Sequence, residues 1–161
     1  MAGTAVVAPI VKHRPRGVVR ISVALACDAS GVISETVIGE AYGRLVGVFY
    51  DGGLDASAVV TLRTAASMSD ATVGAPLVAY TTGTEGTPVA FRPTRVATTN
   101  DGVAIVAGDG SGGGTTGNDV NRDIYVAGKL TLQVASGGVS ETGLIAFVFD
   151  EADLTDVNLL S

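Results

Sequence analysis

The chain has 161 residues and a single cysteine, Cys27, so it is long enough for one domain with its own core and cannot contain an intrachain disulfide. It contains no run of the ~18 apolar residues that a membrane-spanning helix needs, and no signal-peptide pattern opens it. Its net charge of −6 argues against nucleic acid as a partner. Charged residues make up 16% of the chain, against ~25% in typical domains. We therefore expect a protein made in the cytoplasm, with part of its surface covered in an assembly.

Residues 1–17 contain two prolines and no helical periodicity, which predicts an extended N-terminal arm. The arm carries Lys12, Arg14 and Arg16 and no acidic residue, whereas residues 151–161 form an acidic C-terminal tail. Opposite charges at the two ends would guide the arm onto a neighbouring subunit or an acidic surface. Solvated chain ends explain the same charges equally well.

Residues 18–150 predict a single all-β body, an antiparallel β-sandwich or a jelly-roll-like barrel. Alternation of apolar and polar residues, with glycine-rich turns between, predicts strands at residues 18–26, 32–39, 44–51, 59–63, 77–80, 89–96 and 103–107. The strand at 44–51 is apolar on both faces, which favours a central position. Pro93 interrupts the strand at 89–96, which predicts an edge or bulged strand. Residues 108–121 are glycine-rich and predict a long loop.

Residues 124–150 are the most informative part of the chain, because they have the pattern of a β-hairpin. The apolar residues that alternate along the outgoing strand are Ile124, Val126, Leu130, Leu132 and Val134. Ser136-Gly137-Gly138 then offers the residue types of a tight reversal. The return strand at 144–149 is apolar on both faces, so its second face needs a cover such as a neighbouring subunit.

No motif in the sequence predicts catalysis. GDGSGG at residues 108–113 matches a phosphate-binding glycine pattern, but no helix follows it to receive a phosphate. His13 is the only histidine and lies in the arm, which leaves no nucleophile–histidine arrangement on a scaffold. We therefore expect no enzymatic activity and no cofactor or metal, and we interpret Cys27 as a small buried side chain.

Two sets of charged residues can each be interpreted in two ways. Aspartates in and around the 108–121 loop could hold calcium, although their spacing lacks the closing glutamate of an EF-hand; they are Asp101, Asp109, Asp119 and Asp123. Arg92 and Arg95 flank Pro93 and would either pair with acids at an interface or stay solvated.

Three segments resemble the small cement, or decoration, proteins of tailed bacteriophage capsids: GVVRISVALACDASG, RLVGVFYDGG and YVAGKLTLQVASGGVSETGLIAFVFD. The resemblance does not extend to residues 64–122 and transfers no functional residue. It implies a β-rich protein, usually a homotrimer, on the outer surface of the capsid. Such a protein clamps neighbouring subunits of the major capsid protein, and its terminal arms reach onto adjacent subunits.

We accordingly expect a non-enzymatic virion structural protein with the major capsid protein and itself as partners. Lys12, Arg14 and Arg16 are the expected capsid contacts of the arm. The expected interface between copies comprises Leu144, Ile145, Phe147 and Phe149. The alternatives are another phage structural component (a head–tail connector, turret or tail-tube protein), a carbohydrate-binding β-sandwich module, which the shortage of aromatic residues disfavours, and a calcium-dependent adhesin domain.

Overall fold

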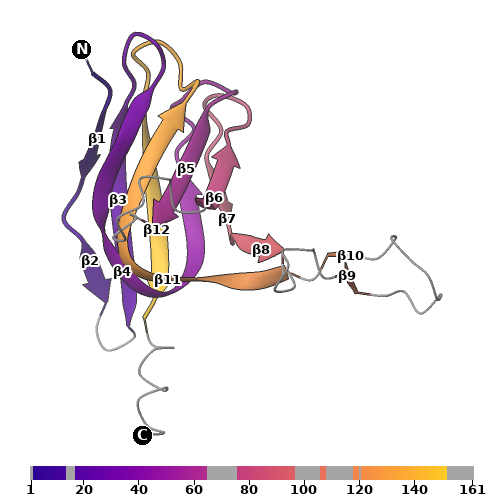
Figure 1. Ribbon diagram of the computed structural model, residues 1–161. Helices are drawn as coiled ribbons and strands as arrows, with labels where there is room; N and C mark the ends of the chain where they lie inside the picture. Colours follow the sequence, from indigo (N-terminus) through magenta and orange to yellow (C-terminus); the bar gives the residue numbers. More distant parts are fainter. Residues whose placement is uncertain are drawn as a thin grey trace, which may run out of the picture.

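The computed structural model describes residues 2–13, 17–64, 76–96, 106–107, 118–119 and 121–151. The all-β prediction is confirmed, because these residues form strands and no helix (Figure 1). The strands are β1 (Thr4–Val7), β2 (Val11–His13), β3 (Val18–Ala26), β4 (Ile33–Tyr50), β5 (Val59–Thr64), β6 (Pro76–Thr81), β7 (Val89–Phe91), β8 (Thr94–Val96), β9 (Val106–Ala107), β10 (Asn118–Asp119), β11 (Asn121–Ala135) and β12 (Thr142–Asp150). Pro93 lies between β7 and β8, so the single interrupted strand predicted at 89–96 is instead two short strands with different partners.

One large antiparallel sheet contains most of these strands. Its order is β1-β3-β12-β4-β11-β5-β6, with β2 also pairing with β3, β7 with β4 and β8 with β11. The sheet folds back on itself, since a Cβ added at Gly39 of β4 would lie 3.5 Å from Cδ1 of Ile21 on β3. The core therefore lies between two halves of a single sheet, which share β4. The strand order alone does not divide the sheet into a two-sheet sandwich or a jelly roll.

The long strand β4 belongs to both halves of the sheet and connects them. The sequence predicts two strands here, at 32–39 and 44–51, and this prediction is wrong because Ile33–Tyr50 is continuous. Gly39 and Gly43 adopt φ values of 143° and 121°, and the register against β11 and β12 shifts at several points along β4. Glycines and bulges bend a strand without ending it. The N-terminal part of β4 thus pairs with β11 and its C-terminal part with β12.

The core is built from one side of each long strand. The predicted apolar face of β11 is confirmed, since Ile124, Val126, Leu130, Leu132 and Val134 are all buried. The same cluster takes in the inward side chains of β3 and β12. Burial of this many branched and aromatic side chains is the main favourable term in folding.

The predicted β-hairpin at 124–150 is wrong, because β11 and β12 do not pair. β4 lies between them, so the chain crosses from one half of the sheet to the other after Ala135. This connection packs on the turn between β3 and β4: the Gly137 N–H donates to the carbonyl of Gly31 at 2.7 Å, and the Ser140 N–H to that of Asp28 at 3.0 Å. The β3–β4 and β11–β12 connections, each of which crosses one strand of the sheet, therefore stabilise each other.

The N-terminal residues are extended, but they lie along the body of their own chain. β1 pairs with β3 from Thr4 opposite Ala26 to Val7 opposite Val23, and β2 pairs with the other end of β3. Residues 14–16, most of the 108–121 loop and residues 152–161 lie outside the described part of the chain.

Candidate interaction surface

The half of the sheet made of β1, β3, β12, the end of β4 and β7 has an apolar side that points away from the core. Paired residues in antiparallel strands point to the same side, so the register identifies its members. Leu144 pairs with Ala24, which pairs with Val6 on β1. Ala146 pairs with Phe49, which pairs with Ala90 on β7. Ser22 pairs with Ala146 and Arg20 with Val148, so these two polar residues share the same side. We call this surface the outer face and define it as Val6, Arg20, Ser22, Ala24, Phe49, Ala90, Leu144, Ala146 and Val148.

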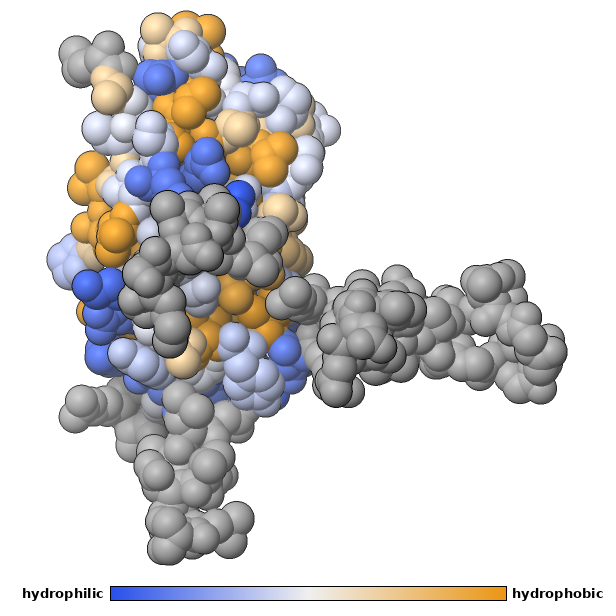
Figure 2. Space-filling view, viewed as in Figure 1, coloured by the Kyte–Doolittle hydropathy of each residue, from blue (hydrophilic) through white to orange (hydrophobic). Residues whose placement is uncertain are grey.

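Large apolar side chains on the outer face are exposed to solvent. Val6 is 62% exposed, Phe49 47% and Leu144 41%. Apolar residues also reach the surface on the side of the molecule shown in Figure 2, among hydrophilic ones. The core therefore does not contain all of the apolar residues of the chain.

Leu144 stands between two hollows in the outer face. One, of about 280 Å³, lies between Leu144, Phe49 and Ala90. The other, of about 360 Å³, lies between Leu144, Val6 and Ala24. The outer face is thus a ridge flanked by depressions lined mostly by apolar atoms.

The structure separates the four residues predicted to form an interface between copies. Leu144 lies on the outer face, but Ile145 (1% exposed), Phe147 (1%) and Phe149 (0%) point into the core. Side chains alternate along a strand, and odd-numbered residues of β12 face inward. The assignment of these three to an interface is therefore corrected: the second apolar side of β12 is Leu144, Ala146 and Val148.

Of the three basic residues assigned to the arm, the described part of the chain includes Lys12 alone. Lys12 is exposed on β2. Arg14 and Arg16 lie outside the described residues.

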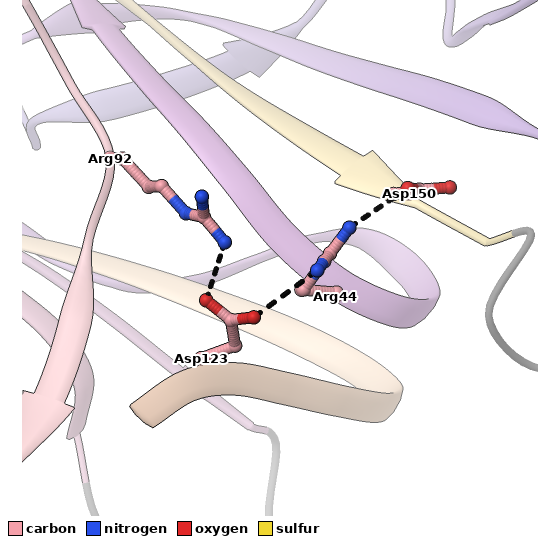
Figure 3. A network of polar contacts seen from close by, with 4 residues as sticks. All are labelled: Arg44, Arg92, Asp123 and Asp150. Atoms are coloured by element: carbon pink, nitrogen blue, oxygen red, sulfur yellow. Dashed lines mark hydrogen bonds and ion pairs between the residues drawn. The ribbon is translucent and has the colours of Figure 1, made fainter. Parts of the chain in front are cut away.

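A charged junction ties together the ends of several strands (Figure 3). Arg44 of β4 contacts Asp123 of β11 through Nη1 at 3.2 Å and Asp150 of β12 through Nη2 at 3.3 Å. Arg92, between β7 and β8, contacts the other carboxylate oxygen of Asp123 at 2.7 Å. Arg92 therefore pairs within its own chain. Asp123, one of the four aspartates considered for calcium, has both carboxylate oxygens engaged by guanidinium groups.

The junction makes the carboxyl group of Asp123 more acidic. Hydrogen bonding from Arg92, and then from Arg44, lowers the pKa of Asp123 below its ordinary value. A carboxyl whose pKa is lower in the folded than in the unfolded chain adds stability above the unfolded pKa, and this stability is lost as the pH falls through the folded pKa.

We expect the free energy of unfolding to decrease as the pH falls from about 5 towards 2, and to decrease less steeply in Asp123→Asn. Urea unfolding at several pH values measures this slope. Glu85→Gln, in an exposed loop, serves as the control and should keep the wild-type slope. Equal slopes for Asp123→Asn and wild type would contradict the role of the junction.

Cys27 is buried at 7% exposure, as interpreted from the sequence. Burial, and then the neighbouring Asp28 and Glu141, raises the pKa of its thiol. A thiol that stays protonated is a poor nucleophile and a poor metal ligand. Cys27 therefore acts as a core side chain.

Within the described residues, no group of three or more histidine, cysteine, aspartate or glutamate side chains is placed to hold a metal ion. The same part of the chain contains no helix with the length and apolar character to cross a membrane. No family model matches the chain, and neither do any curated proteins or solved structures.

Proposed function

We propose that this chain is a non-enzymatic virion structural protein, a capsid decoration protein. It would sit as a homotrimer on the outer capsid surface and clamp neighbouring subunits of the major capsid protein. The resemblance of the three β-segments supports this function. The structural observation that carries it is the outer face. An exposed apolar surface on a well-packed β-body suits a protein whose role is to bind other subunits.

A clamp of this kind needs a contact surface and no catalytic residues. Burial of apolar area contributes roughly 25 cal/mol per Å², from which the cost of association is subtracted. A contact of modest strength becomes effective when it recurs across every seam of a closed shell. The β-body also offers a rigid scaffold, since the charged junction and the two packed crossings fix the relative positions of its strands.

We assign the capsid contact of this protein to the basic residues near its N-terminus. Lys12→Glu combined with Arg14→Glu and Arg16→Glu should lower occupancy on purified expanded capsids, because like charges would then face an acidic surface. Co-sedimentation followed by gel densitometry measures occupancy. Substitution is a cleaner change than truncation, because removal of residues 1–16 would also remove β1 and β2 from the edge of β3.

The matched control is Lys129→Glu, at an exposed lysine on β11, a strand that pairs with neither β1 nor β2. It should leave occupancy unchanged, and thermal unfolding should show that all variants are folded. Wild-type protein that does not co-sediment with expanded capsids would overturn the proposed function. Wild-type occupancy in the triple variant would overturn only the role of the basic residues.

A carbohydrate-binding module is the second candidate, and one observation favours it. Tyr42 of β4 (47% exposed) and Tyr125 of β11 (59% exposed) lie on the same solvent-facing side of the sheet. Tyr42 pairs with Ala127, so the two rings are diagonal neighbours. Two exposed rings form a small platform for a sugar, whereas the outer face involves five strands. We therefore place the virion role first, ahead also of a connector, turret or tail-tube component.

A further inference from the structure

We propose that the outer face is covered by a second copy of this chain, with Arg20 of one copy opposite Asp51 of the other. Because like faces meet, this contact is isologous and closes as a two-fold pair, so it is additional to the contacts within the homotrimer of the proposed function. The inference goes beyond that proposal and does not rest on attachment to a capsid.

The outer face is large enough for a weak self-association. β3 and β12 each extend nine residues, or about 30 Å, whereas β1 and β7 contribute only four and three residues. With strands ~4.8 Å apart, the face offers roughly 450 Å² per copy, about half of the ~800 Å² per partner of a standard interface and in the range of weak, transient contacts.

The shape of the outer face suits a copy of itself. Leu144 projects between the two hollows, and Phe49 and Val6 project on either side. In a contact between copies, the projecting side chains of one face can enter the depressions of the other. A surface that carries both parts side by side supplies both halves of such a contact.

The charges at the outer face are also self-complementary. Arg20 pairs in register with Val148, whereas the Asp51 N–H donates to the carbonyl of Leu144. The two charges are thus separated by about four residues of β12, or about 13 Å along the strand. When two such faces meet with their strands antiparallel, the Arg20 end of one copy lies over the Asp51 end of the other.

These two charges have little to engage them inside their own chain. Arg20 is exposed and makes no ion pair within the part of the chain that the structure describes. Asp51 accepts one backbone hydrogen bond, from the Gly53 N–H at 3.0 Å, and is otherwise open to solvent. Arg20 and Asp51 both line the hollow beside Phe49, and Asp51 lines the second hollow as well. Opposite charges within an apolar face fix the register of a partner rather than its affinity.

The first experiment tests the apolar contact by multi-angle light scattering across a range of protein concentrations. Wild-type protein should have a mass of several 16.1 kDa chains. Leu144→Lys and Phe49→Lys should raise the dissociation constant at least about a hundredfold, because each places a charge in the contact. The control Tyr125→Lys, at a residue that is more exposed but lies on β11 in the other half of the sheet, should keep the wild-type mass. A monomeric wild type, or unchanged masses in both face variants, would overturn the inference.

The second experiment tests the charge pairing directly. Arg20→Glu and Asp51→Lys should each raise the dissociation constant about tenfold or more, since like charges would then meet. The double variant restores opposite charges and should recover most of the wild-type affinity. A double variant weaker than both single variants would overturn the pairing, provided that all three have wild-type melting temperatures.

The two proposals fail in different ways. A monomer that still co-sediments with capsids would overturn self-association through the outer face and leave capsid attachment intact. An oligomer that does not co-sediment with capsids would overturn the virion role and leave the outer face as the self-association surface.

Discussion

Phe147→Ala should destabilise the protein by about 3–5 kcal/mol, because it removes a fully buried aromatic ring and leaves a cavity. Phe147 of β12 pairs with Ile21 on one side and Val48 on the other, so its ring lies inside the folded sheet. A domain of this size has a total stability of ~5–15 kcal/mol, so the loss is a large fraction of it. Urea unfolding monitored by circular dichroism measures the difference.

Tyr125→Ala is the control for the loss of an aromatic ring from a strand. Tyr125 lies on the long strand β11 and is 59% exposed, so we expect a change of about 1 kcal/mol or less. The pair of variants decides between a core position and a surface position for Phe147. Similar small losses in both would show that Phe147 lies at a surface, as an interface residue would.

The side of each strand that faces the core could largely be read from the sequence. Alternation along β11 identifies its buried residues, because a side-chain period of two is a local property of extended backbone. For β12 the same pattern is ambiguous, since Leu144 to Phe149 are all apolar. Only the folded sheet decides that Phe147 belongs to the core and Leu144 to the outer face.

The partners of each strand could not be read from the sequence. Residues 136–138 have the composition of a tight turn, yet the chain there crosses over β4. Turn composition reflects local backbone preferences, whereas strand pairing depends on contacts far along the chain. The prediction of two strands in place of β4 was wrong for the same reason. Gly43 resembles a strand end in the sequence, but it lies at a bend within one continuous strand.

The charged junction was likewise beyond reach of the sequence. Its members are far apart in the chain, and each looks like an ordinary surface charge in the sequence: Arg44, Asp123 and Asp150. They meet only because β4 pairs with both β11 and β12 near these residues. Sequence composition did indicate an excess of apolar surface, and the outer face is where the fold places part of it.

The two glycines that bend the central strands should respond very differently to substitution. Gly43 of β4 and Gly128 of β11 have nearly the same φ, 121° and 123°. Alanine is strained at either position, at a cost of about 1–3 kcal/mol. Around Gly128 there is open space for a Cβ atom, whereas a Cβ atom at Gly43 would overlap the carbonyl group of Asp150 and approach Glu151.

We therefore expect Gly43→Ala to lose at least about 2 kcal/mol more stability than Gly128→Ala, because an overlap with backbone adds to the shared strain. Urea unfolding of the two variants isolates this difference, since the backbone term is common to both. The clash would also push the end of β12 away from β4, where Asp150 contacts Arg44. Equal stabilities for the two variants would mean that β12 does not approach β4 as closely as the structure shows.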